Sequence, residues 1–398
     1  MKLKRLLAIL LAMALMAAAC GSDGDDTAAE APAEAPAPAE EPAEEPAEEP
    51  AEEPAEEPAE EPAEEENMHP DWPESLVFGF VPSQEQDQLQ DDIQPFIDVL
   101  EEALGIDVEG IVTTDYTGLV TAMGTDQADL GAFGPFGYTL GADQFGNIEP
   151  LIQSVRFGSA TYHGQWFTNA DNLADLCPDG AQTATALENS ADGVVQVGAL
   201  DAVALQVGVF FGDDGKSLGE MTDDGGAISA GSSCIGDIAN VAGKTIAWTT
   251  ETSTSGFLFP ALQLQDIGID ANADVNGVFT GGHDAAVSAV LNGDADVGLS
   301  FDDARRTLRK ENLTVGDDVV VFAITDEIPN DVVAIRSALP EDLKAAIYDA
   351  IEAFLATEEG EAIFDAVYGW TDIRPATESD FDIVRAAAAG LGITEPPG

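Results

Sequence analysis

The 398-residue sequence predicts an α/β protein in which short buried strands alternate with amphipathic helices along most of the chain. Two observations predict this class. Runs of four to six apolar residues are followed by segments whose apolar residues are spaced by three or four, and turn-forming residues separate the two kinds of segment. This alternation is typical of lobes built on a largely parallel sheet. About 330 residues follow an unusual N-terminal region, which is enough for two lobes with separate cores.

The first 20 residues have the pattern of a secretory signal. Lys2, Lys4 and Arg5 precede an apolar run at 6–15, and three alanines then lead to Cys20. This order describes a signal peptide, and the run is shorter than the about 20 residues that span a bilayer. Because the segment before it resembles a bacterial lipobox, we expect Cys20 to carry a lipid anchor. An ordinary cleaved signal with a chance cysteine is the alternative.

Residues 21–71 are expected to form a disordered acidic tether. From Glu41 onward the sequence repeats Glu-Pro-Ala-Glu, with proline at every fourth position. These prolines remove amide donors and prevent a regular helix, while the clustered glutamates repel one another and extend the chain. We therefore expect a stiff spacer, partly polyproline II, with a reach on the order of 100 Å.

The charge of the folded part excludes one class of partner. The whole chain has a net charge of −62, and residues 67–398 have 56 acidic against 11 basic side chains, a net charge of −45. A domain this acidic is not expected to bind nucleic acid or an anionic membrane surface through its charge. The acidic residues are scattered, so we expect them to solvate the surface, and a saline habitat is one hypothesis for their number.

The first lobe is predicted from residues 72–138. Three apolar runs predict strands, and two segments with three- or four-residue spacing predict helices: strands at 76–81, 108–112 and 129–133, and helices at 89–104 and 117–123. Ligands of such sheets bind beyond the carboxyl ends of the strands. Ser83, Tyr116 and the turn at 134–138 all fall at such ends or just after them.

A different composition begins after residue 161. Residues 177–234 are rich in glycine, aspartate, serine and alanine, with one apolar patch at 203–211, and are interpreted as an insertion. Cys177 and Cys234 are the two cysteines that remain beyond Cys20. An isolated pair outside the cell tends to be bridged, so a disulfide between them is a tentative expectation.

The α/β rhythm resumes after the insertion. Strands are predicted at 245–249, 296–301 and 319–324, and helices at 343–355 and 380–391. The strand at 245–249 is followed by Thr252, Ser253, Thr254, Ser255 and Gly256, where a helix is predicted to open. Helix starts have unpaired N–H groups, and hydroxyls beside them make an uncharged, donor-rich cradle for an anion. An ordinary N-cap is the alternative, although one hydroxyl would suffice for it.

Two further strand-to-helix junctions are candidates for the same site. Gly281 and Gly282 precede His283, and glycines let a backbone approach a ligand closely. Asp302 follows another predicted strand, and its carboxylate could accept a hydrogen bond from an anion that still has a proton, which would reject fully deprotonated anions. A helix cap is the alternative for both residues.

The sequence has no motif of a common enzyme or metal site. The three histidines, His69, His163 and His283, lie in no zinc-binding spacing, so no metal site is expected. A nucleophile elbow and a phosphate-binding Walker loop are both absent from the sequence. We therefore expect no enzyme activity and no cofactor.

At this point the motifs resemble those of a known family, the phosphonate-binding components of ABC importers, which bind phosphate, phosphite or phosphonates. The similar segments run in the family's order: 78–83, 114–116, 134–138, 253–257, 280–285 and 328–331. The resemblance implies a type II periplasmic-binding-protein fold with two lobes, each a sheet flanked by helices, that close around the ligand. It implies a first lobe at 72–160 and 330–398, a second lobe at 161–329, and a hinge of two crossing strands near 162–167 and 331–336.

The resemblance also implies the residues that contact the ligand. The first lobe would supply Tyr116 together with Tyr138 or Phe136. The second lobe would supply the following residues: Ser253, Thr254, Ser255, His283 and Asp302. Family members that bind an aminoalkylphosphonate have an acid soon after the histidine. Asp284 is the candidate here, with a helix cap as the alternative. The insertion at 177–234 departs from the short link of the family.

We therefore expect a monomeric, lipid-anchored solute-binding protein on the extracytoplasmic face of the cell membrane. It would capture a phosphorus oxyanion and deliver it to ABC permease subunits, and closure would bury the anion against neutral donors because so acidic a domain has few bases. The alternatives are a binding lobe for another small oxyanion or organic acid, and a sensor lipoprotein that feeds no permease. An enzyme with Ser253 as nucleophile is a third, but no histidine lies near it in sequence.

Overall fold

The structure, a computed structural model, describes residues 69–394 apart from 157, 170–171, 181, 184–208, 212–216, 220–230 and 309–310. The expected signal, the Cys20 anchor, nearly all of the tether and most of the expected insertion lie outside the described residues. Residues 67–398 form one compact unit of the chain. In its described part, no helix is long and apolar enough to cross a membrane.

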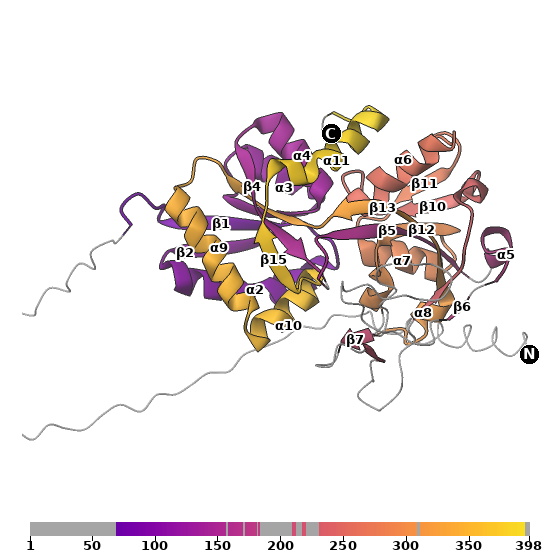
Figure 1. Ribbon diagram of the computed structural model, residues 1–398, viewed down its shortest axis with the longest axis horizontal. Coiled ribbons are helices and arrows are strands. Elements are labelled where there is room, and N and C mark those ends of the chain that lie inside the picture. Colours follow the sequence, from indigo (N-terminus) through magenta and orange to yellow (C-terminus); the bar gives the residue numbers. More distant parts are fainter. Residues whose placement is uncertain are drawn as a thin grey trace, which may run out of the picture. The chain divides into compact units, whose positions relative to one another are not determined.

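A six-stranded sheet is the centre of the first lobe (Figure 1). The strand order is β15-β4-β14-β3-β1-β2. In chain order the strands are β1 (Ser75–Phe80), β2 (Asp107–Val112), β3 (Leu130–Phe133), β4 (Ile148–Val155), β14 (Val332–Arg336) and β15 (Asp372–Pro375). β1 pairs in parallel with β2 and β3, but β14 is antiparallel to β3 and β4. The sheet is therefore mixed, and the prediction of a largely parallel sheet was wrong, because β14 returns from the second lobe against the direction of β3.

Helices cover both faces of this sheet. On one face, α2 (Gln86–Leu104), α9 (Glu341–Leu355) and α10 (Glu358–Tyr368) share an apolar core with β1 and β2. On the other face, α3 (Tyr116–Gly124) and α4 (Pro135–Phe145) pack with Phe133 and Phe381. The last segment of the chain adds η4 (Glu378–Phe381) and α11 (Asp382–Leu391).

The helix α2 shows how local sequence forms these elements. Its apolar residues recur every three or four positions and all are buried: Leu89, Ile93, Phe96, Ile97, Leu100 and Leu104. The side chain of Glu85 accepts a hydrogen bond of 2.8 Å from the N–H of Gln88, which caps the first turn. Gly105 ends the helix with a φ of 67°, a left-handed conformation that glycine adopts without a Cβ penalty.

A seven-stranded sheet is the centre of the second lobe. The strand order is β11-β10-β12-β5-β13-β9-β6. In chain order the strands are β5 (Thr161–Asn169), β6 (Gln182–Thr183), β9 (Ser232–Ser233), β10 (Thr245–Trp248), β11 (Asn276–Phe279), β12 (Val297–Phe301) and β13 (Val319–Pro329). β10 pairs in parallel with β11 and β12, whereas β5 is antiparallel to both β12 and β13, so this sheet is also mixed. A separate hairpin joins β7 (Val209–Phe211) to β8 (Ser217–Gly219).

The helices of the second lobe follow its strands. They are α5 (Leu173–Leu176), η1 (Ile238–Val241), the π-helical turn η2 (Thr254–Leu258) continued by α6 (Phe259–Asp266), α7 (His283–Leu291), η3 (Ala304–Leu308) and α8 (Val315–Asp318). Cys177 and Cys234, whose Cα atoms are 5.7 Å apart, form a disulfide, as the sequence analysis expected. Both cysteines are buried in an apolar cluster with Trp166 and Trp248.

The chain crosses between the two lobes at two neighbouring places, after β4 and after β13. Asn330 holds these crossings together, because its buried side-chain amide donates to the carbonyls of Ser154, at 3.1 Å, and Ser159, at 2.8 Å. The C-terminal helix α11 packs on both α4 and α6, so it contacts both lobes. The cavity described below lies close to these crossings.

Candidate binding site

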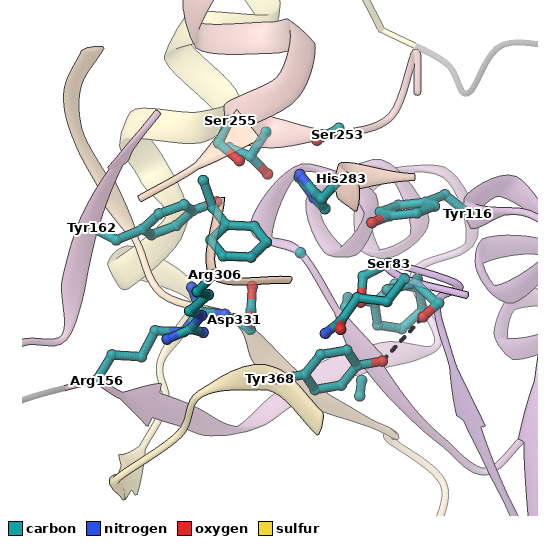
Figure 2. Close-up of a pocket in the computed structure, with 17 residues that line it drawn as sticks. Ser83, Tyr116, Arg156, Tyr162, Ser253, Ser255, His283, Arg306, Asp331 and Tyr368 are labelled. Carbon is teal, nitrogen blue, oxygen red and sulfur yellow. Dashed lines mark hydrogen bonds and ion pairs between the residues drawn. The ribbon is translucent and has the colours of Figure 1, made fainter. Parts of the chain in front are cut away.

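A small cavity of about 40 Å³ lies between the lobes and is lined by residues of both (Figure 2). Four helices begin at it: α3 at Tyr116, α4 just after Gly134, η2 just after Ser253, and α7 at His283. The N-terminal ends of helices have partial positive charge and N–H groups without intrahelical partners. Their convergence favours an anionic occupant.

The hydroxyl run forms one wall of this cavity, as Figure 2 shows for Ser253 and Ser255. Ser253 Oγ accepts the N–H of Gly256 at 3.1 Å, and Thr254 Oγ1 accepts the N–H of Phe136 at 2.9 Å. A hydroxyl oxygen that accepts from an N–H still has its own proton to donate. Both side chains are buried, so the local hydrogen bonds hold them in place while their protons stay available for a ligand.

His283 adds a neutral ring to the same wall. Its Nδ1 shares a hydrogen bond of 2.6 Å with Ser300 Oγ, so Nε2 is the ring nitrogen left for a ligand. Burial and, to a smaller extent, the nearby charge of Arg156 together lower the pKa of His283 to about 3. The ring is therefore uncharged at neutral pH and takes part through a hydrogen bond.

The first lobe contributes hydroxyl groups from the opposite side. Ser83 follows β1, and its Oγ is buried without a hydrogen-bond partner among the described residues. Burial raises the pKa of Tyr116 above its ordinary range, so its phenol stays protonated and can donate. Tyr368 donates to the carbonyl of Val81 at 3.1 Å, which directs its ring along the cavity (Figure 2).

Charged residues from both lobes line the remaining side, which the sequence analysis did not predict. Arg156 follows β4 and forms an ion pair with Asp331, so this pair joins the two crossings between the lobes. Arg156 Nε is buried without a partner among the described residues. Arg306, in η3, also lines the cavity. The lining of the cavity therefore includes charged side chains as well as neutral donors.

Two aromatic rings support these guanidinium groups. The Cζ atom of Arg156 lies 5.3 Å from the ring centroid of Tyr162 and 5.6 Å from that of Phe301. Arg306 Cζ lies 5.5 Å from the same Phe301 ring. Tyr162 also interacts with the side chain of Ser255, and burial raises the pKa of the Tyr162 phenol above the ordinary range. The rings thus link the charged side of the cavity to the hydroxyl wall.

Several predicted site residues do line the cavity: Tyr116, Ser253, Thr254, Ser255 and His283. The other four do not. Tyr138 lies within the first lobe, where its hydroxyl donates to Glu378 at 2.7 Å. Phe136 is fully buried, and only its main-chain N–H reaches Thr254. Both side chains are placed by α4, which begins at the cavity but points them into the cores on either side of it.

The two predicted carboxylates are also displaced from the cavity. Asp284 lies in the first turn of α7, outside the cavity lining, and burial raises the pKa of its carboxyl. Asp302 lies behind the lining, where its Oδ2 accepts the N–H of His163 at 3.3 Å, and burial raises its pKa well above the ordinary value. The carboxylate that does line the cavity is Asp331.

The sequence contained weak signals for the residues that were missed. Arg156 and Arg306 are two of only 11 basic residues beyond residue 66, so each stood out by its rarity. Arg156 and Asp331 lie beside the expected hinge strands, where a binding protein places its cleft. No local pattern indicated that they would meet, because 175 positions separate them in the chain. No group of three or more metal-binding side chains occurs in the part of the chain that the structure describes.

The comparison with protein families gives one match over most of the chain. Residues 78–381 match the family model described as ABC transporter, phosphonate, periplasmic substrate-binding protein. The chain is 26% identical over 332 residues to the phosphate-import protein PhnD of Mycolicibacterium smegmatis, covering 79% of this chain and 85% of that protein. It is 22% identical over 319 residues to the phosphonates-binding periplasmic protein of Escherichia coli, covering 79% and 76%.

Two solved structures show the fold to which this chain is similar. PhnD1 of Prochlorococcus marinus in complex with methylphosphonate has a TM-score of 0.59 at 17% identity, covering 80% of this chain and 99% of that one. A binding-protein component of an ABC phosphonate transporter from Pseudomonas aeruginosa has a TM-score of 0.58 at 17% identity, covering 79% and 85%. At this identity the likeness shows the fold, which is that of type II periplasmic binding proteins and confirms the predicted fold class.

Proposed function

The chain belongs to the family of periplasmic substrate-binding proteins of ABC phosphonate transporters, and we propose that it captures a phosphorus oxyanion and delivers it to an ABC permease. Its place as the binding component of an importer is extracytoplasmic, and its relatives are binding components rather than enzymes. One observation carries the proposal for the ligand. Ser83 and Arg156 both line the cavity, and Ser83 Oγ and Arg156 Nε are buried without a partner among the described residues.

A buried polar group without a partner costs about 1–3 kcal/mol, and more if it is charged. An occupant that offers acceptor oxygens to both donors would remove this cost. The hydroxyls of Ser253 and Thr254 supply further donors from the second lobe. Each hydroxyl oxygen accepts a hydrogen bond from a main-chain N–H, which holds it in place. A phosphorus oxyanion offers several acceptor oxygens at tetrahedral angles, which suits donors that converge from both lobes.

Isothermal titration calorimetry with phosphate, phosphite and methylphosphonate tests this function. We expect at least one of them to bind at micromolar concentration. Thr254→Val keeps the shape of the side chain but removes its hydroxyl, and we expect it to weaken binding about tenfold or more. Thr125→Val, at an exposed helix end, is the matched control. Absence of binding of all three at millimolar concentration would contradict the proposal, and binding of another small oxyanion or organic acid in their place would support the first alternative.

Delivery to a permease is distinguished from sensing by uptake. We expect cells that lack this protein to lose uptake of the ligand and to regain it when the chain is restored. Normal uptake in the deletion strain, combined with a lost transcriptional response to the ligand, would support a sensor instead.

The lipid anchor is a separate proposal that rests on the signal-like segment before Cys20. We propose that a diacylglyceryl group on Cys20 holds the protein at the membrane, with residues 21–71 as the tether. Cys20→Ser should move the protein from the membrane fraction to the soluble extracytoplasmic fraction. Equal retention of the wild-type protein and Cys20→Ser in the membrane fraction would contradict the lipid anchor.

We also propose that residues 72–160 with 330–398 and residues 161–329 act as two lobes that close on the ligand as a monomer. The distribution of the strands supports these boundaries, because each sheet draws its strands from one of the two sets of residues. Small-angle scattering of the folded part should show a smaller radius of gyration with ligand than without it. An unchanged radius, or a mass of two chains, would contradict this proposal.

A further inference from the structure

One hydroxyl lies among the otherwise apolar residues of β12. The strand reads Val-Gly-Leu-Ser-Phe, and the hydroxyl belongs to Ser300, which is fully buried. A buried hydroxyl needs a hydrogen-bond partner, because leaving it unpaired costs free energy. Among the described residues, the side-chain partner of Ser300 Oγ is His283 Nδ1, at 2.6 Å. His283 lines the cavity, whereas Ser300 lies behind it.

The contacts of the His283 ring hold it in one orientation. Ser300 bonds to Nδ1, and the ring of Phe301 packs edge-on against the imidazole, with 4.8 Å between the centroids. Both partners come from the end of β12. The other ring nitrogen, Nε2, has no hydrogen-bond partner among the described residues. Figure 2 shows the ring among the residues that line the cavity, so Nε2 is the nitrogen that a ligand would meet.

The position of the ring proton follows from the partners of Ser300. The ring is uncharged at neutral pH, because burial and the charge of Arg156 lower its pKa to about 3, so only one ring nitrogen has a proton. If Nδ1 had it, Ser300 Oγ would accept, and the serine proton would have no acceptor among the described residues. If Ser300 donates to Nδ1, its proton is bonded and the ring proton is on Nε2. The second arrangement leaves no proton of this buried pair without use.

The tautomer decides what the ring offers to a ligand. With its proton on Nε2, His283 is a donor toward the cavity and matches an anion oxygen that has only lone pairs. With its proton on Nδ1, the ring would present a lone pair to that oxygen and repel it. A phosphorus oxyanion has more acceptor oxygens than protons, so the donor form suits it.

Resting on the proposed function, we propose that Ser300 is a positioning residue of the binding site. Its hydroxyl donates to His283 Nδ1 and fixes the tautomer in which Nε2 has the proton and donates to the anion. Ser300 acts on the ligand only through this ring. The pair thereby selects anions that present an unprotonated oxygen to His283.

Nitrogen NMR reads the tautomer directly in protein that is labelled with ¹⁵N in its histidines. The sequence has three histidines, and His283→Gln identifies the signals of His283 by their loss. At neutral pH and without ligand, we expect Nε2 to have the chemical shift of a protonated ring nitrogen and Nδ1 that of an unprotonated one. A proton on Nδ1, or on both nitrogens, would overturn the proposal.

Binding measurements test whether Ser300 acts through the ring. Ser300→Ala removes the donor to Nδ1, and we expect affinity for phosphate or methylphosphonate to fall about fivefold or more, with His283 signals shifted toward protonated Nδ1. In a His283→Gln background, the same change should alter affinity by less than about twofold, because the two effects are not independent. An equal loss of affinity in both backgrounds would overturn the role of Ser300.

Two further variants separate positioning from a general effect on the fold. Ser300→Thr keeps a hydroxyl at the same place, and we expect it to keep the wild-type tautomer and most of the affinity. Ser154→Ala, at another buried serine outside the cavity, is the matched control and should change neither the His283 signals nor the affinity. Loss of affinity in a folded Ser300→Ala protein with unchanged His283 signals would contradict the proposal.

The failure of this inference is distinguishable from failure of the proposed function. The NMR experiment on the wild-type protein needs neither a ligand nor a folded Ser300 variant. If phosphate, phosphite and methylphosphonate all fail to bind, the proposed function is overturned, and with it the role of Ser300 toward an anion. If one of them binds while His283 has its proton on Nδ1, only the role of Ser300 is overturned.

Discussion

The main-chain N–H of His283 donates a hydrogen bond of 3.1 Å to the main-chain carbonyl of Ser83, and this bond joins the two lobes beside the cavity. Ser83 follows β1 of the six-stranded sheet, whereas His283 begins α7 on the seven-stranded sheet. A second bond between the lobes, from Phe136 N to Thr254 Oγ1, lies at the same site. Residues that line the cavity therefore also form hydrogen bonds between the two lobes.

Ser83 is expected to act on the ligand rather than on the fold. Its Oγ has no partner among the described residues, so Ser83→Ala should leave the melting temperature nearly unchanged. Affinity for the oxyanion should fall about tenfold, because a hydrogen bond to a charged group contributes about 1.5–3 kcal/mol. Ser154→Ala is the matched control, since Ser154 Oγ is also buried without a described partner but lies outside the cavity. Equal affinity of the two variants, measured by calorimetry, would contradict this role.

Gly369 is expected to leave the space that the guanidinium of Arg306 occupies. A Cβ atom at this position would lie 2.2 Å from Arg306 Nη2, and the backbone has a φ of +69°. Gly369→Ala should therefore displace the guanidinium and weaken binding at least tenfold. Gly146→Ala has the same left-handed cost of about 1–2 kcal/mol, at a φ of +68° with nothing within 4 Å. The two variants should melt at similarly lowered temperatures, and only Gly369→Ala should lose affinity.

His283 should contribute a pH dependence to stability. Its pKa is about 3 in the folded protein, against 6.5 when unfolded. Above pH 6.5 neither state binds the proton, whereas between pH 6.5 and 3 only the unfolded state does, so stability falls as the pH falls. At pH 5 the loss is about 2 kcal/mol.

His283→Gln should abolish this component of the free energy of unfolding, measured by urea denaturation at pH 7 and pH 5. His69→Gln, at a ring whose side chain is 44% exposed, should keep it. If the free energy of unfolding fell equally in the wild-type protein and in His283→Gln between these pH values, the prediction that the buried ring is neutral would be contradicted.

The disulfide should stabilise the second lobe without affecting the ligand. Cys177 and Cys234 are separated by 57 positions, and a loop of that length contributes about 4 kcal/mol in the chain-entropy model. The double substitution to serine should lower the melting temperature and shift urea unfolding accordingly. Oxyanion affinity at low temperature should stay within about twofold, since neither cysteine lines the cavity. A large loss of affinity in the folded variant would show that the bridge also shapes the site.

Most helices and strands could be predicted from the sequence, because they are determined by residues within a few positions of one another. The spacing of Leu89, Ile93 and Phe96 predicted α2, and Gly105 predicted its end. The hydroxyl run at Ser253–Ser255 lies at a helix start, as predicted, because strand-to-helix junctions place such residues together in the chain. The mixed direction of the sheets was missed, since it depends on strands that arrive from the other lobe.

The identity of the carboxylate that lines the cavity shows why other parts of the site could not be predicted from the sequence. Asp302 follows a predicted strand and Asp331 begins an expected hinge strand, and their local sequences do not distinguish which one faces the cavity. The ion pair with Arg156 holds Asp331 in the cavity lining. The main-chain N–H of His163 donates to Asp302 and holds it behind the lining. Both partners are more than 130 positions away in the chain.

The sequence by itself determined the α/β class, the family motifs and the hydroxyls at the start of η2, because these depend on periodicity and on neighbours within a few positions. Only the tertiary structure decided that Arg156, Arg306 and Asp331 line the cavity, and that Tyr138, Phe136, Asp284 and Asp302 do not. The physical reason is that a side chain's role in the cavity depends on which distant strand or helix it packs against. The composition of the site is therefore a property of the tertiary arrangement of the two lobes rather than of any one segment.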